Sequence, residues 1–100
     1  MYAMTGKLSA QPGKRGQLAE ILLHASKMVA GMQGCRSYIV LEDVQAESTL
    51  WVFEMWDDKE SHDASLRDEN VRALIGEAMP ILAGAPDGAE LHVLGGHGVI

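Results

Sequence analysis

The segment from Leu50 to Trp56, with the sequence LWVFEMW, is the part of the chain that most restricts its fold. Successive side chains of a strand point to opposite faces, and in this segment apolar side chains occupy both faces. Other parts of the protein must cover both faces of such a strand if its apolar side chains are to be removed from water. The chain has 100 residues, which is enough for one domain with a small core. Few other helices or strands are therefore available to cover the two faces of this strand.

Strands and helices alternate along the rest of the chain in a simple order. Alternating apolar residues predict strands, and apolar residues spaced three and four apart predict amphipathic helices. The predicted strands span 2–10, 35–42, 48–56 and 89–94, and the predicted helical stretches span 14–32, 58–67 and 71–82. Asp57 and Asn70 are the expected N-terminal caps of the last two helical stretches. The residues 86–88 read as a turn.

The order strand, helix, strand, strand, helix, strand is that of a ferredoxin-like α+β domain, βαββαβ. We expect a four-stranded antiparallel sheet with its helices on one face, formed by residues 1–95, and a flexible, glycine-rich tail at 96–100. The second face of the sheet has no cover within the chain. We therefore predict a homodimer in which two sheets face each other and enclose an apolar pocket.

Charge and composition exclude several classes of partner. The formal net charge is -6 with only 8 Lys and Arg residues, which disfavours nucleic acid as a partner. No apolar run approaches the about 20 residues that span a bilayer, and the N-terminus lacks the pattern of a secretory signal, so we expect no membrane partner. The single Cys35 fits a reducing compartment. These features predict a complete, cytoplasmic chain.

His62 and Glu54 are the candidate catalytic residues. An imidazole exists in both protonation states near neutral pH, which suits His62 to proton transfer. The alternative is a structural histidine that forms a hydrogen bond across the dimer. Glu54 lies in an otherwise apolar strand, where an unpaired carboxylate is costly to bury. It either orients His62 or a bound hydroxyl, or forms a salt bridge to Arg36 or Arg72.

Three further side chains are candidates for the substrate pocket. Trp56 shares the strand face of Glu54, whereas Trp51 lies on the opposite face, so Trp56 is the expected aromatic wall. Tyr38 would supply a phenolic hydrogen bond. Leu66 follows His62 by four residues and lies on the same side of its helix. The alternative for each of these aromatic rings is that it only packs in the core or the dimer interface and does not contact a substrate.

Known cofactor motifs are missing from the sequence. It contains no P-loop, dinucleotide fingerprint, zinc-binding cysteine pair or nucleophile elbow. The histidines His24, His92 and His97 show no spacing typical of a metal site. The sequence therefore predicts neither a metal nor a cofactor.

The stretch Phe53-Glu54-Met55-Trp56, followed by an acidic step and then by His62, resembles the antibiotic-biosynthesis monooxygenase family, including its small quinol monooxygenase-like members. In that family an aromatic-Glu-x-aromatic strand precedes a helix with a histidine, and the order of elements also fits nearly all of this chain. The haem-degrading members carry an Asn on the first strand. Residues 2–9 contain none, which disfavours haem breakdown.

The resemblance implies a homodimeric α+β barrel that oxidises an aromatic phenol or quinol with dioxygen, without metal, flavin or haem. An electron-rich phenolate can itself deliver an electron to oxygen, so the protein mainly binds the substrate, excludes water and manages protons. The competing hypothesis is a non-catalytic dimeric protein, such as a stress-related one, that holds a small ligand in the same pocket, because one fold hosts many functions.

Overall fold

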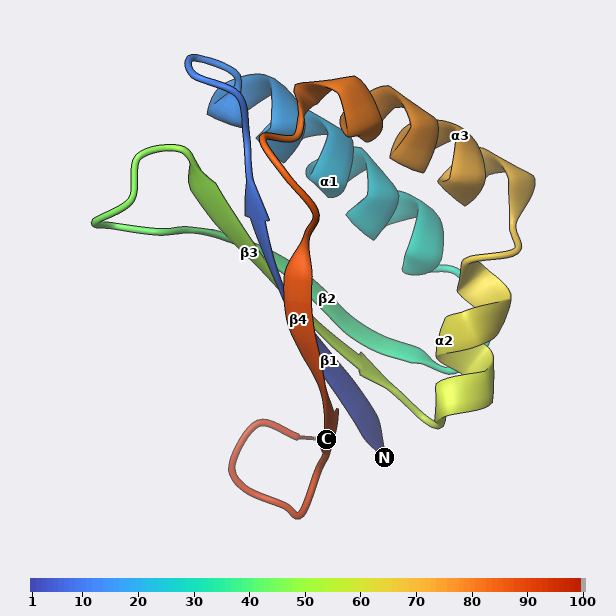
Figure 1. Cartoon of the computed structure of the whole chain (residues 1–100). Coiled ribbons are helices and arrows are strands. Elements are labelled where there is room, and N and C mark those ends of the chain that lie inside the picture. Colours follow the sequence, from blue (N-terminus) through green and yellow to red (C-terminus); the bar gives the residue numbers. More distant parts are fainter. Residues whose placement is uncertain (100) are drawn as a thin grey trace.

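The computed structural model describes residues 1–99, and its elements follow the predicted order (Figure 1). They are β1 (Tyr2–Ser9), α1 (Arg15–Val29), β2 (Cys35–Glu42), β3 (Thr49–Trp56), α2 (Lys59–Ser65), α3 (Glu69–Ala78), the 3-10 turn η1 (Met79–Ile81) and β4 (Asp87–His92). This arrangement confirms the ferredoxin-like α+β fold. Residues 93–99 form neither helix nor strand, and residue 100 of the predicted tail lies outside the described residues.

The four strands form one sheet in the order β2-β3-β1-β4, with antiparallel neighbours throughout. Met4 in β1 lies opposite Glu54 in β3, which in turn lies opposite Tyr38 in β2. Because side chains alternate between faces, these three residues share one face of the sheet. Helices α1 and α3 lie over this same face (Figure 1).

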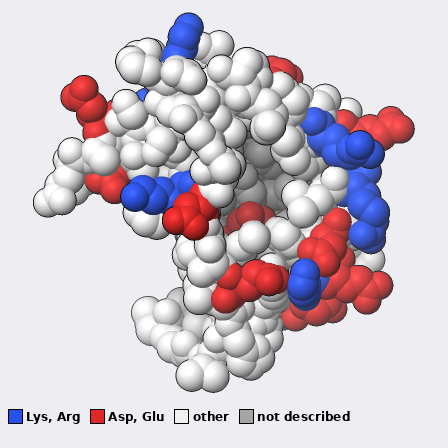
Figure 2. All heavy atoms as spheres, viewed as in Figure 1, with Lys and Arg blue, Asp and Glu red and all other residues white. Residues whose placement is uncertain are grey.

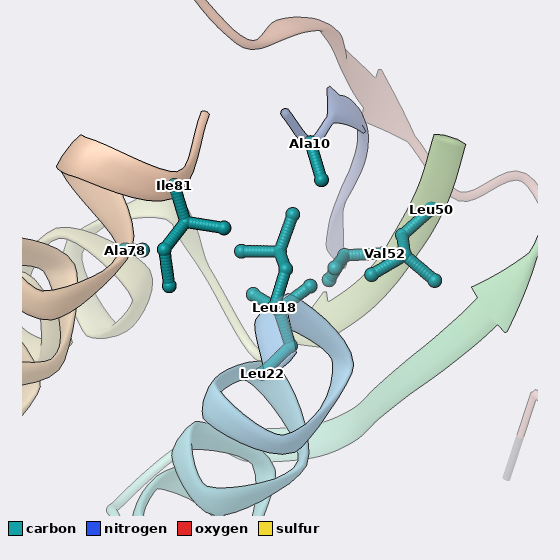
Figure 3. Packing of buried hydrophobic residues seen from close by; sticks show 7 residues of the cluster. All are labelled: Ala10, Leu18, Leu22, Leu50, Val52, Ala78 and Ile81. Atoms are coloured by element: carbon teal, nitrogen blue, oxygen red, sulfur yellow. The ribbon is translucent and has the colours of Figure 1, made fainter. Parts of the chain in front are cut away.

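The hydrophobic core lies between the sheet and these helices, toward the end where β1 meets α1. Leu18 on α1 and Leu50 on β3 are fully buried. Figure 3 shows the cluster that they form with Ala10, Leu22, Val52, Ala78 and Ile81. Full burial of a leucine contributes about 1.5–3 kcal/mol, so these contacts hold α1 and the end of α3 on the sheet.

The N-terminal caps of the two later helices differ from those predicted. Asp58, not Asp57, caps α2 by accepting a hydrogen bond from the Ser61 backbone N–H at 2.8 Å. Asp68, not Asn70, caps α3. In each case the true cap stands immediately before the first helical residue, with its carboxylate within reach of the free N–H groups of the first turn.

The last strand begins earlier than predicted. Asp87 and Gly88 belong to β4 rather than to a turn, and Gly88 lies opposite Gly6 in β1. A Cβ atom at position 88 would lie 2.6 Å from the backbone oxygen of Thr5. The glycine therefore permits a close strand approach here, although glycine is usually typical of turns.

The sheet face away from the helices carries exposed apolar side chains. Leu41 lies opposite Trp51, and Ile39 lies opposite Phe53, so all four share this face. Ile39 is 49% exposed and Leu41 is 44% exposed. The two-faced apolar character predicted for β3 is thus present, and the helices cover one of its faces. Within residues 1–99, no helix has both the length and the apolar character needed to cross a membrane.

Candidate functional site

A cavity of about 480 Å³ lies between the sheet and the helices of a single chain. Strands β1 and β3 form its floor, α1 and α3 form its roof, and α2 lies at one end. Figure 2 shows the molecule hollowed between the helices and the β4 edge. This cavity lies within one chain, and the pocket predicted between two facing sheets stays a prediction, because it needs a second copy of the chain. The small residues Gly6, Ala25, Ala78 and Gly88 on its walls leave space between the layers that larger side chains would fill.

His62 is held firmly at the α2 end of this cavity. The residue is only 4% exposed. Its ring lies between Tyr2, at a centroid distance of 5.3 Å, and Trp56, at 5.9 Å and nearly perpendicular. Nδ1 lies 3.0 Å from Asp63 Oδ1, and Nε2 lies 4.0 Å from Glu54 Oε1. The two ring nitrogens therefore face different carboxylates.

Glu54 projects from the C-terminal half of β3 into the cavity, where its side chain is 15% exposed. Its Oε1 accepts a hydrogen bond of 3.0 Å from Trp56 Nε1. Burial raises the pKa of the Glu54 carboxyl above its usual value, although the Trp56 hydrogen bond and the nearby His62 act in the opposite direction. The alternative salt bridge to Arg36 is wrong, because Arg36 pairs with Asp57. Among the described residues, Arg72 forms no ion pair with Glu54 either.

Trp56 does not line the cavity, in contrast to the prediction. It shares the face of Glu54 as expected, but its side chain is fully buried against Val29 and Val71. The ring lies beneath the end of α1, where no open space reaches it. Its contribution to the site is the hydrogen bond that holds the Glu54 carboxylate.

Tyr38 and Leu66 do line the cavity, and they lie at different depths. Tyr38 on β2 is half-buried, and burial, aided by the negative charge of Glu54, raises the pKa of its hydroxyl. Leu66, the C-terminal cap of α2, is 47% exposed at the cavity rim, together with Ile75 and Met79 of the α3 segment. Leu66 thus lies at the entrance and not against the sheet.

Sequence reasoning missed Asp63 and Tyr2, both of which contact His62. Asp63 is the next residue along α2, so an acidic residue beside the candidate base was an available signal. Tyr2 is distant in sequence and reaches His62 only because β1 pairs with β3, which places Tyr2 opposite Trp56. That contact depends on the strand register and on the position of α2.

The charges around the cavity are few. The titratable side chains that line it are Glu54, His62, Tyr38 and Asp87. No Lys or Arg lines it in the part of the chain that the structure describes. An anionic ligand would therefore lose its hydration without gaining an ion pair to a Lys or Arg side chain. The arrangement suits an uncharged, mostly apolar molecule with a hydroxyl group directed at His62 and Glu54.

Residues 1–99 bring together no group of three or more His, Cys, Asp or Glu side chains that could hold a metal ion. His24 and His92 lie exposed on α1 and β4. The polar side chains at this end of the cavity are Glu54, His62 and Tyr38, which can form hydrogen bonds to a ligand.

Comparisons with known proteins agree with this architecture. A crystal structure from Chloroflexus aurantiacus J-10-fl, of a protein provisionally named an antibiotic biosynthesis monooxygenase, is 37% identical, with a TM-score of 0.87 over 98% of this chain and 97% of that one. A Deinococcus radiodurans protein of the same provisional name is 20% identical, with a TM-score of 0.86 over 100% of this chain and 99% of that one. Rv0793 from Mycobacterium tuberculosis is 19% identical, with a TM-score of 0.86 over 96% and 97% of the two chains.

The last two similarities concern the fold alone. No protein of curated function matches the sequence. The family model for antibiotic biosynthesis monooxygenases matches residues 1–77, which include β1, Glu54 and His62. Since this match covers well over half of the chain, the protein belongs to the antibiotic biosynthesis monooxygenase family.

Proposed function

We propose that this protein is a cytoplasmic, cofactor-independent monooxygenase that oxidises an uncharged aromatic phenol or quinol with dioxygen. The observation that carries the proposal is the position of His62 Nε2, which lies 4.0 Å from Glu54 Oε1 at the end of an apolar cavity. Membership of the antibiotic biosynthesis monooxygenase family supports this reaction class. The volume of about 480 Å³ lies within the range of about 300–1,000 Å³ that is typical of small-molecule sites.

In the proposed reaction His62 removes the proton of the substrate hydroxyl at Nε2, and Glu54 orients that hydroxyl. The resulting phenolate transfers one electron to dioxygen, which gives a phenoxyl radical and superoxide. The two radicals combine to form a carbon-bound peroxide. This peroxide takes the proton back from His62, and the resulting hydroperoxide loses water as its carbon gives up its C–H proton and becomes a carbonyl. The substrate thus loses two hydrogens and gains one oxygen atom, and the second oxygen atom leaves in water.

The apolar walls serve this sequence in two ways. They exclude bulk water from the phenolate and peroxide, which limits side reactions. They also leave His62 and Glu54 as the polar groups nearest the substrate hydroxyl, so that the hydroxyl end of the substrate is drawn to them.

Oxygen uptake tests this proposal. Purified protein, stripped of metals, is mixed with a panel of anthrone and 1,4-naphthohydroquinone derivatives, and 6-hydroxy-2-naphthoic acid is included as an anionic comparison. We expect uptake above the background rate with the uncharged compounds. His62→Ala should reduce kcat by about 100-fold or more, because general base catalysis contributes about that much. If ligands bind in the cavity but uptake equals the background for every compound, the binding-protein alternative replaces the proposal.

We also propose that the protein acts as a homodimer joined through the exposed sheet face. Leu41, Trp51 and Ile39 lie together on this face, and Leu91 of β4 is 43% exposed beside Ala3. An apolar patch of this kind is typical of protein interfaces. The two cavities would then lie on the outer sides of the paired sheets, one in each subunit.

A further inference from the structure

The His62 ring lies between the inner end of the cavity and the protein surface. Its Nε2 faces Glu54 inside the cavity, and its Nδ1 faces Asp63, whose side chain is 39% exposed. Asp63 therefore contacts the candidate base from the side away from the substrate. The carboxylate lies 3.0 Å from Nδ1, which is within hydrogen-bonding distance.

Asp63 is itself held in place by a chain of contacts from three elements. Lys59 Nζ lies 3.1 Å from Asp63 Oδ2 and 3.4 Å from Glu90 Oε2 of β4. Glu90 in turn accepts a hydrogen bond of 2.8 Å from the Tyr2 hydroxyl, and the Tyr2 ring packs on His62. The contacts close a loop from α2 through β4 and β1 back to His62.

These contacts fix the protonation pattern of the pair. The hydrogen bond from His62 and the nearby Lys59 hold the pKa of the Asp63 carboxyl below its usual value, so this group is ionised at neutral pH. An ionised carboxylate only accepts hydrogen bonds, so His62 Nδ1 must be the donor. In the neutral imidazole the other nitrogen, Nε2, then carries a lone pair and no hydrogen.

We propose that Asp63 is a positioning residue that holds His62 in the Nδ1–H tautomer, so that the Nε2 lone pair faces the cavity, and that stabilises the imidazolium formed when Nε2 takes a proton. The groups that face His62 are Glu54 and Trp56 from β3, Tyr2 from β1 and Asp63 from α2. Lys59 and Glu90 act on it through Asp63 and Tyr2. The tautomer part of the proposal is independent of any reaction; the imidazolium part rests on the proposed function.

Nitrogen-15 NMR of histidine-labelled protein tests the tautomer directly. His62→Gln identifies the His62 signals among those of the 4 histidines. We expect the neutral wild-type ring to show the Nδ1–H pattern. Asp63→Ala removes the acceptor at Nδ1 and should shift this pattern toward the Nε2–H form. A ring that remains Nδ1–H in Asp63→Ala, or that is Nε2–H in the wild type, overturns the proposal.

Kinetics test the second part with any substrate found active. Asp63→Asn should lower kcat on the order of 10-fold or more with little change in KM, because the charge that stabilises the imidazolium is lost. Glu60→Ala, which removes an exposed acidic side chain from the same helix, is the control and should retain wild-type kcat. An Asp63→Asn enzyme with wild-type kcat contradicts the imidazolium role while leaving the monooxygenase assignment intact.

Discussion

Glu54 is the side chain whose burial most affects the chemistry of the site. The carboxyl lies in a mostly apolar cavity, with a hydrogen bond from Trp56 and with His62 at 4.0 Å. Its surroundings raise the pKa of the carboxyl, so that the folded protein binds the Glu54 proton more tightly than the unfolded chain does. A carboxyl of this kind changes protonation closer to neutral pH than an exposed glutamate does, and in either form it can hydrogen-bond a substrate hydroxyl.

A stability measurement follows from the direction of this shift. As pH rises above the usual glutamate value of 4.5, the unfolded chain loses the Glu54 proton first, so the folded state loses stability through this group until the folded carboxyl has also ionised. Glu54→Gln removes the titration while its amide oxygen still accepts from Trp56. The Tm difference, variant minus wild type, should therefore increase between pH 4 and pH 7 in thermal unfolding, by either calorimetry or circular dichroism. A difference that is constant or that decreases contradicts the assigned direction.

At the residue scale, the sequence indicated His62 and Glu54 as candidate site residues more clearly than it indicated their neighbours. Both are polar groups within or beside an apolar stretch, and such a departure from pattern is visible in sequence. Trp56 was assigned to the correct face, but burial beneath α1 removed it from the cavity. The alternation of side chains along a strand predicts which face of the sheet each one lies on, whereas its exposure depends on the elements that pack over that face.

Among the elements, α2 has the most important position because it carries His62 and Asp63. Gly34 sets that position. It precedes β2 with a φ of 85° and its backbone oxygen accepts a hydrogen bond of 2.8 Å from the Asp57 N–H. A Cβ atom at position 34 would lie 2.5 Å from Ser61 Oγ and 2.7 Å from Ser61 Cβ. The glycine thus lets α2 approach β2 closely.

Gly34→Ala should therefore destabilise the protein and displace α2. The strained φ alone costs about 1–3 kcal/mol, and the contact with Ser61 adds to that cost. Urea unfolding should show the loss in unfolding free energy, and the activity or the His62 NMR signals should report the displacement. Gly31→Ala is the matched control, because a Cβ atom at position 31 would meet no other part of the chain within 4 Å and φ is not positive there. Equal stability of the two variants would contradict this role of Gly34.

The order of the elements was predictable, whereas several of their ends were not. The predicted strand at 35–42 agrees with β2 because glycines and a hairpin connection limit it on both sides. The two helix caps and the start of β4 were wrong, since several acidic residues compete for the cap positions and Gly88 is compatible with both a turn and a strand. Local sequence does not distinguish such alternatives.

For the whole molecule, the exposed sheet face predicts self-association. Ile39→Lys places a charge at this face, where Ile39 lies opposite Phe53. Leu23→Lys is the control on the outer surface of α1, where Leu23 is 51% exposed. Sedimentation at micromolar concentration should show a dimer for the wild type and for Leu23→Lys, and a monomer for Ile39→Lys. A monomeric wild type, or a dimeric Ile39→Lys, would contradict the sheet-face interface.

The location of the cavity could not be predicted from sequence. The apolar pattern of β3 indicated that both sheet faces need cover, but the distance between the helices and the sheet depends on how small residues from β1, β4, α1 and α3 meet in space. That arrangement is a property of the packed molecule. The pattern therefore indicated a pocket between two sheets, which needs a second copy of the chain, but gave no sign of the cavity beneath the helices.

The most direct test of the monooxygenase assignment is the fate of the two oxygen atoms of dioxygen. The reaction is run under ¹⁸O₂ with a substrate that shows protein-dependent uptake, quenched quickly, and analysed by mass spectrometry. We expect one labelled oxygen atom in the product carbonyl, with the second in water and no hydrogen peroxide released. An unlabelled product accompanied by hydrogen peroxide would show that the protein acts as a simple oxidase and would contradict the monooxygenase assignment.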